Sequence, residues 1–213
     1  MSYYLDLQTW KRKDHYLLFS KMDNPFFNIC ANLDITIFHN HIKTINAPFF
    51  ISFLYIASKA ANEVEEFKLR IRKEGIFLHD KVHPSFTVMG EDDMFSFCYS
   101  DFSSNFPEFA ADAKRAIEKV KIKGSLNDDE NRDDYLYITS IPWITFTSVS
   151  HPFSTNKMDS VPRISWGKFE DKDGRKSIPI SVSLHHGLAD GFHVAMYLKH
   201  MQEYLDHPHE YIT

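Results

Sequence analysis

Two segments with strong helical periodicity lie between runs of β-forming residues, and this arrangement restricts the fold more than any other feature. Apolar residues recur at helical spacing over 48–64 and over 105–121. A third helix is expected from Gly191 to about Tyr204, with Asp190 as its N-cap. Helices and strands do not follow a regular strand–helix–strand rhythm. We therefore predict the α+β class, a two-layer sandwich with a mixed β-sheet.

The strand and turn signals lie outside these helices. Runs rich in β-forming residues predict strands over 28–33, 69–78, 85–89, 95–99, 136–139, 144–149, 161–169 and 177–184. The segment 171–174 ends in Asp-Gly and predicts a hairpin between the last two strands. A weaker helical pattern covers 10–19, the triplet at 39–41 is interpreted as a helix surface, and the polar stretch 121–134 predicts an exposed loop.

Length, charge and cysteine usage exclude several classes of protein. The 213 residues suit one domain spanning 1–213, and 24 Lys+Arg against 29 Asp+Glu give a formal charge of −5. No basic stripe is present, so nucleic acid is not expected as a partner. Cys30 and Cys98 cannot form a disulfide framework. No apolar run approaches the ~20 residues that a bilayer requires, and we expect a cytoplasmic protein without a membrane partner.

The segment 179–193 carries the chemistry of the chain. Its strand alternation places His186 on the apolar face and His185 on the polar face. His186 lies where the strand stops, at Gly187, so its ring can project into a pocket as a neutral imidazole. That form is the one a general base requires. Asp190 can cap the following helix or pair with a cation.

Two other interpretations of these side chains stay open at this point. A set of His185, His186, Asp190 and His193 has ligand types that suit zinc or iron. The two adjacent histidines face opposite sides of a strand, however, and do not readily converge on one ion, so no metal is expected. The histidines can also be core residues whose nitrogen atoms are satisfied by the backbone.

Residues 185–191 read His-His-Gly-Leu-Ala-Asp-Gly and match the His-His-x-x-x-Asp-Gly signature of the CoA-dependent acyltransferases. The following Phe-His-Val makes the sequence similar to the trimeric, type A class of the chloramphenicol acetyltransferase family. Further similar segments occur in the family order, so the resemblance covers essentially the whole chain: 10–16, 33–36, 82–88 and 141–143.

This resemblance implies a fold, a reaction and an assembly. It implies the CoA-dependent acyltransferase fold and transfer of acetyl from acetyl-CoA, the co-substrate, to an alcohol such as chloramphenicol. Antibiotic resistance would follow from that reaction. It also implies a homotrimer with active sites between subunits. His186 would be the general base, Arg12 would pair with Asp190, Thr139 would donate to the oxyanion in place of the family's serine, and Ser165 would hold a water.

The resemblance also implies binding residues, with less fidelity to the family pattern. The residues expected to contact CoA are Trp143, Lys168 and Phe169, and those expected to contact the acceptor are Leu18, Phe19 and Phe95. Ser140 is a weaker substitute for Thr139. The alternatives are an acyltransferase of the same fold acting on another alcohol, the catalytic core of a 2-oxo acid dehydrogenase complex, and a non-enzymatic binding module.

Overall fold

The computed structural model describes residues 1–90, 93–122, 124, 126, 132–153 and 158–213. Its strands are β1 (Tyr3–Tyr4), β2 (Phe26–Asp34), β3 (Leu69–Arg72), β4 (Gly75–Leu78), β5 (His83–Met89), β6 (Phe95–Tyr99), β7 (Tyr135–Ile141), β8 (Arg163–Gly167), β9 (Glu170–Lys172) and β10 (Arg175–His185). Its helices are α1 (Lys13–Phe19), α2 (Thr36–Thr44), α3 (Phe49–Asn62), α4 (Phe106–Ile122) and α5 (Gly191–Asp206).

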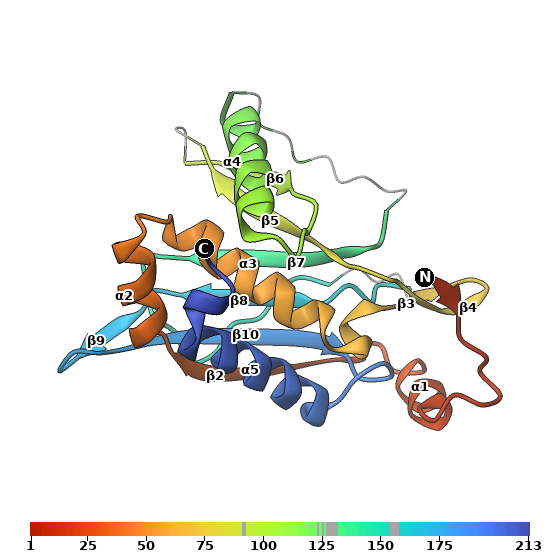
Figure 1. The fold of residues 1–213 in the computed structure, drawn as a ribbon. Coiled ribbons are helices and arrows are strands. Elements are labelled where there is room, and N and C mark those ends of the chain that lie inside the picture. The colour runs from red at the N-terminus through yellow and green to blue at the C-terminus, as the bar shows by residue number, and fades with distance from the viewer. Residues whose placement is uncertain (91–92, 123, 125, 127–131, 154–157) are drawn as a thin grey trace.

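A mixed sheet forms the centre of the molecule, with the strand order β2-β10-β8-β7-β5-β6. The neighbours β5, β7 and β8 run parallel, whereas β6, β10 and β2 pair antiparallel with theirs. The short strand β9 pairs antiparallel with the first residues of β10, to which a hairpin joins it. A separate small sheet, β1-β4-β3, lies at one end (Figure 1). The α+β prediction with a mixed sheet is confirmed.

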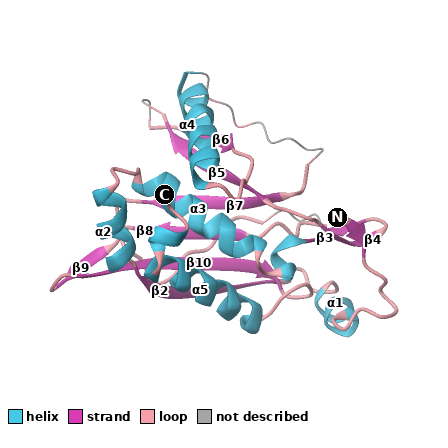
Figure 2. Ribbon diagram, in the orientation of Figure 1, coloured by secondary structure: helices cyan, strands magenta, loops and turns pink. Residues whose placement is uncertain are grey.

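Helices cover one face of the main sheet. Figures 1 and 2 show α3 and α5 running side by side across it, with α4 standing over β5 and β6. The sheet residues on this face are apolar and buried, among them Ile138, Ile164 and Val182. These side chains pack against the helices in one continuous hydrophobic core. Burying each of them stabilises the fold by roughly 1.5–3 kcal/mol.

The opposite face of the same strands is polar. Thr139, Ser165 and Ser181 lie in register on β7, β8 and β10, so their side chains share this face. The hydroxyl of Ser181 donates to the side-chain oxygen of Asn28 on β2 over 2.7 Å, and that of Ser183 does the same. The candidate catalytic hydroxyls therefore lie on the sheet face away from the helices.

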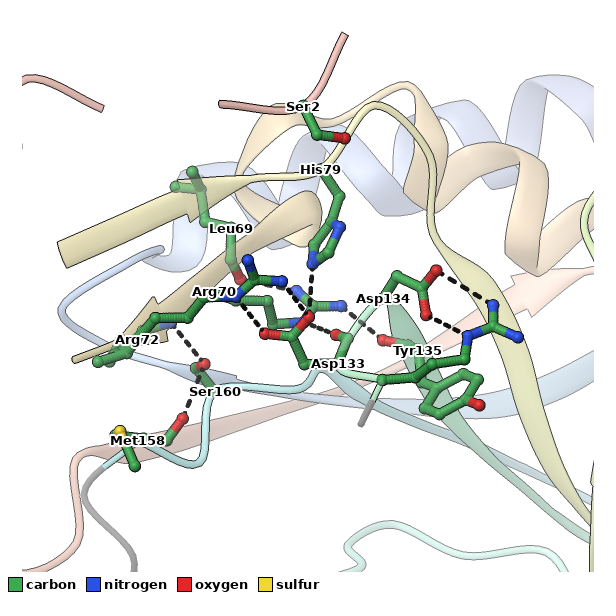
Figure 3. Close-up of polar contacts among 12 residues, drawn as sticks. Ser2, Leu69, Arg70, Arg72, His79, Asp133, Asp134, Tyr135, Met158 and Ser160 are labelled. Carbon is green, nitrogen blue, oxygen red and sulfur yellow. Dashed lines mark hydrogen bonds and ion pairs between the residues drawn. The ribbon is translucent and has the colours of Figure 1, made fainter. Parts of the chain in front are cut away.

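An arginine and aspartate cluster joins the small sheet to the start of β7. The guanidinium of Arg70 is fully buried and donates to backbone carbonyls of both elements, including those of Leu69 and Tyr135. Figure 3 shows Arg72 and His79 converging on the carboxylate of Asp133, at 2.6 Å and 2.8 Å. These bonds hold the first residue of β7 against β3.

Several sequence predictions need correction. The segment Ile144–Val149 is not a strand: it follows a turn at Pro142, leaves Ile144 58% exposed, and lies beside the end of β8 without continuing the sheet. The run 69–78 is two strands joined by a turn. His39 lies in helix α2 but is buried against Phe169 rather than on a surface. In the predicted loop 121–134, residues 123, 125 and 127–131 lie outside the described residues.

Candidate active site

His186 follows directly after β10, where the chain turns toward α5. Its backbone amide donates to the carbonyl of Pro25 over 2.8 Å, which fixes the turn against the segment before β2. The imidazole stacks on the ring of Phe19, with centroids 4.0 Å apart, and lies 4.6 Å from that of Phe27. The ring is half-buried, so it is held firmly and still reaches the surface of the chain.

The hydrogen bonding of His186 fixes the tautomer of its ring. Its Nδ1 atom lies 3.1 Å from the carbonyl oxygen of Ala189. A carbonyl can only accept, so Nδ1 carries the proton and donates it. The Nε2 atom of the neutral ring then keeps its lone pair. The side chain is thus arranged to accept a proton at Nε2.

An ion pair supports this turn from the N-terminal segment. Arg12 donates to the carboxylate of Asp190 over 2.7 Å and to the carbonyl of His186 over 3.3 Å. Burial disfavours the charged carboxylate, but the hydrogen bond from Arg12 and the charge of His193 outweigh it, so the pKa of Asp190 is lowered to about 2. Asp190 also caps α5 by accepting from the amide of Phe192. Both roles considered for Asp190 are present.

His185 occupies a different environment from its neighbour. It is 2% exposed, and its Nδ1 accepts from the amide of Gly187. Burial lowers the pKa of His185 to about 4, so its ring is neutral and satisfied by the backbone. A Cβ on Gly187 would lie 3.0 Å from this ring, and only glycine fits the turn without a shift. Within the described residues, no group of three His, Cys, Asp or Glu side chains is arranged to hold a metal ion.

A cavity of about 280 Å³ lies on the polar face of the sheet. Thr139 of β7 lines it, together with Thr87, Phe97 and Tyr137 from neighbouring positions. Ser165 of β8 stands opposite Thr139 in the parallel pairing. No described residue forms a hydrogen bond with the Thr139 hydroxyl, which leaves this group available to a ligand. We refer to this space as the Thr139 cavity.

His186 and the Thr139 cavity are well separated within one chain. Thr139 is in register with Ser165 and Ser165 with Ser181, and His186 comes five residues after Ser181. With strands about 4.8 Å apart and residues about 3.3 Å apart along a strand, this places the two side chains roughly 19 Å from each other. One chain alone does not bring His186 and the Thr139 hydroxyl together.

A second cavity, of about 300 Å³, opens where β5 and β7 end. It is lined by Trp143, Ser140 and Phe95, together with Phe50 and Ile117 from the helices. Ser140 follows Thr139, so the two side chains point to opposite faces of the sheet. Thr87 lines both cavities. We refer to this second space as the Trp143 cavity.

The residues predicted to bind CoA are only partly brought together. Trp143 is 63% exposed at the rim of the Trp143 cavity. Lys168 follows β8 and donates its amide to the carbonyl of Ile144 over 2.7 Å, which holds the two chain segments side by side. Phe169 packs against Phe49 at the edge of the helical layer.

The residues predicted to contact the acceptor are also divided. Phe19 stacks on His186, and the neighbouring Leu18 is 55% exposed at the end of α1. Phe95 lies far along the sheet, on β6, where it lines the Trp143 cavity and not the Thr139 cavity. The structure thus places Leu18 and Phe19 near His186 and apart from Phe95.

Sequence reasoning missed His151, a residue of the loop between β7 and β8. Its Nε2 atom lies 2.8 Å from the hydroxyl oxygen of Ser165, and it lines the Thr139 cavity. The sequence contains a weak signal, because a histidine beside Pro152, just after a run of β-forming residues, is a candidate for a constrained polar contact. The predicted strand over 144–149 places His151 in a connecting segment, for which the sequence predicts no site residue.

No helix of the described residues is both long enough and apolar enough to cross a bilayer.

Comparison with known proteins gives one consistent result. The family model described as chloramphenicol acetyltransferase matches residues 1–202. A chloramphenicol acetyltransferase 2 of Haemophilus influenzae is 27% identical over 204 residues, which are 95% of this chain and 96% of that protein. A chloramphenicol acetyltransferase of Bacillus pumilus is 25% identical over 208 residues, covering 97% of this chain and 94% of the relative.

Solved structures agree with this result. A chloramphenicol acetyltransferase superposes with a TM-score of 0.89 at 25% identity, covering 96% of this chain and 100% of the other. The cubic core of a pyruvate dehydrogenase multienzyme complex superposes with a TM-score of 0.69 at 20% identity, covering 93% and 88%, and shows a shared fold. The match over nearly the full length places this chain in the chloramphenicol acetyltransferase family of acyltransferases.

Proposed function

We propose that the chain transfers the acetyl group of acetyl-CoA to a hydroxyl of a chloramphenicol-like alcohol, with His186 as the general base. The observation that carries this proposal is the hydrogen bond from Nδ1 of His186 to the carbonyl of Ala189, because it assigns the proton of the neutral imidazole to Nδ1 and the lone pair to Nε2. The family to which the chain belongs supports the reaction type.

The reaction proceeds by direct transfer in a ternary complex. Nε2 of His186 takes the hydroxyl proton as the alcohol oxygen bonds to the thioester carbon. Negative charge then develops on the former carbonyl oxygen, and the hydroxyl of Thr139 donates a hydrogen bond to it. The carbon–sulfur bond breaks as the carbonyl re-forms, and the CoA sulfur leaves with the proton held by His186. No protein nucleophile takes part.

The two cavities suit two co-substrates that meet at β7. The Thr139 cavity carries aromatic and hydroxyl side chains and suits a compact alcohol. The Trp143 cavity is apolar, opens on the helical side and suits the pantetheine arm of acetyl-CoA. Thr87 lines both, so a thioester that reaches past the strand ends comes close to Thr139.

The active site is completed by a second copy of the chain in a homotrimer. General-base catalysis requires contact over about 2.6–3.2 Å, whereas His186 and Thr139 lie roughly 19 Å apart in one chain. A neighbouring subunit that places its His186 in the Thr139 cavity brings the base within hydrogen-bonding distance of the acceptor. The exposed apolar side chains beside the base, Leu17 and Leu18, suit burial in such an interface.

A second candidate is the same acetyl transfer to a different alcohol. The observation that favours it is the presence of a histidine in the lining of the Thr139 cavity, where His151 joins the hydroxyl side chains. An apolar pocket discriminates between substrates by only ~1–3 kcal/mol per methylene. Hydrogen-bonding groups in the cavity therefore influence the choice of acceptor more than its apolar side chains do.

Release of the CoA thiol, measured with a panel of alcohols, tests the proposal. Turnover with chloramphenicol supports the first candidate, and turnover with another alcohol alone selects the second. Absence of thiol release with every acceptor would contradict both. Expression in a sensitive bacterium is the matching cellular test, since acetylation of chloramphenicol should raise the tolerated concentration of the drug, and the His186→Ala variant should not.

A further inference from the structure

The hydrogen bond between His151 and Ser165 is a polar contact that the proposed chemistry leaves unused. Nε2 of His151 lies 2.8 Å from Oγ of Ser165. Ser165 is fully buried, so its hydroxyl cannot form a hydrogen bond with bulk water. His151 reaches it from the loop that crosses the polar face and also lines the Thr139 cavity. The imidazole thus lies between the hydroxyl and the space where the acceptor would bind.

The neighbours of Ser165 have other partners or face the ligand. Ser181, next to Ser165 on β10, donates to Asn28. The hydroxyl of Thr139, on the other side, makes no hydrogen bond with the described residues. Ser165 is therefore the member of this row whose hydroxyl is oriented by a side chain from outside the sheet.

The charged group beside His151 is already engaged. The Arg163 guanidinium donates to Asp159 over 2.7 Å and to the carbonyl of Val161 over 3.1 Å. It also lies over the ring of Phe153, 4.7 Å from the centroid. Burial, followed by the charge of Arg163, lowers the pKa of His151, so this ring is neutral near pH 7. The imidazole of His151, rather than the guanidinium of Arg163, is the polar group that can form a hydrogen bond with a neutral ligand.

We propose that the hydrogen bond with Ser165 holds the His151 imidazole in the lining of the Thr139 cavity, where His151 selects alcohols with a second hydrogen-bonding group beside the reacting hydroxyl. This inference rests on the proposed acetyl transfer. One hydrogen of the neutral pair lies between Nε2 and Oγ. Nδ1 of His151 makes no hydrogen bond with the described residues, so it is left to bond a ligand in the cavity that His151 lines. The contact lies on the face away from the Trp143 cavity, so it concerns the acceptor and not acetyl-CoA.

Steady-state kinetics of matched variants test the proposal. His151→Leu removes the hydrogen bond, whereas His151→Gln keeps a group that can donate and accept. The KM for an acceptor with a second polar group should rise about threefold to tenfold in His151→Leu, the range for one hydrogen bond. The KM for acetyl-CoA should stay unchanged, and His151→Gln should restore most of the acceptor affinity. His209→Leu, at an exposed histidine outside the cavities, is the matched control.

A double-mutant cycle separates positioning from simple packing. In the His151→Leu background, Ser165→Ala should cause no further rise in the acceptor KM, because the imidazole that the serine hydroxyl holds is gone. Full additivity, or equal rises in the KM values of both co-substrates, would overturn the proposal. If His151→Leu does not fold, as judged by circular dichroism, His151→Phe replaces it in the comparison with His151→Gln.

The outcome also distinguishes this inference from the proposed function. An unmodified protein that turns over no alcohol would contradict both. An active protein in which His151→Leu leaves the acceptor KM unchanged would contradict only the role of His151.

Discussion

The imidazole of His186 stacks on the ring of Phe19, with the two planes only 12° apart. This contact brings the end of α1 against the turn after β10, so a helix from the N-terminal segment holds the base. Together with the bond from Nδ1 to Ala189, it leaves the ring little freedom to rotate. The base is thus oriented before any substrate binds.

Replacing His186 by Ala should lower kcat by roughly 10²–10⁴-fold, the contribution expected of a general base. Turnover measured by thiol release, with circular dichroism for folding, checks this. His209→Ala removes an exposed imidazole and should leave the rate unchanged. A His186→Ala protein that is as active as the parent would rule out the mechanism.

Thr139→Val should reduce kcat by about 10²–10³-fold, because it removes the hydroxyl while keeping the shape of the side chain. Thr139→Ser keeps the donor and should retain most of the activity. The two variants differ mainly in that hydroxyl, so their comparison isolates its effect. Equal activity in both would mean that another group, such as Ser140, stabilises the oxyanion.

Arg12→Ala should lower the free energy of unfolding by about 1–3 kcal/mol and slow turnover, because it leaves the Asp190 carboxylate without its partner. The pKa of Asp190 is about 2 in the folded chain, below the ~3.9 of an unfolded Asp. The pair thus stabilises the fold above pH ~4 and loses this effect as the pH falls. Urea unfolding measures it, with Arg175→Ala, a 79% exposed partner of Asp34, as the control. An unchanged midpoint would contradict the structural role of the pair.

Asp133→Asn should make the stability of the fold depend less on pH between pH 7 and pH 3. Burial disfavours its charge, yet the hydrogen bonds from Arg72 and His79 hold the pKa of Asp133 well below its usual range. Such a carboxylate stabilises the fold above the unfolded pKa of ~3.9, and the effect disappears as the pH falls through the folded value. Melting temperatures between pH 7 and pH 3 should fall less steeply in the variant. Asp23→Asn, at an exposed position, should keep the parental slope.

Much of the fold could be predicted because its helices have clear periodicity. The helices α3 and α4 begin and end within two residues of the predicted 48–64 and 105–121. The hairpin at 171–174 was equally clear, since Asp173 and Gly174 both have positive φ. The segment Ile144–Val149 failed because β-forming residues predict a strand only where a neighbour is available to pair with them.

The candidate site was predictable only where its residues are close in the sequence. The turn containing His186 and Asp190 could be located from one motif, and Arg12 from a similar N-terminal segment. The contact of His151 with Ser165 depends on how a long loop folds back over the sheet, and no local pattern encodes that path. The separation of the base from the Thr139 cavity depends on strand order, which periodicity does not specify.

The buried Arg70 contacts main-chain oxygen atoms alone in the bonds that join β3 to β7. Its recognition of the neighbouring segment is therefore independent of which side chains that segment carries. Apart from Asp133, whose carboxylate binds Arg72 and His79, the residues leading into β7 are thus open to evolutionary change at little cost to the bonds of Arg70. The arginine itself has no substitute of similar reach and donor number. Substitutions in β7 that change the preferred acceptor could therefore accumulate without weakening the hydrogen bonds of Arg70.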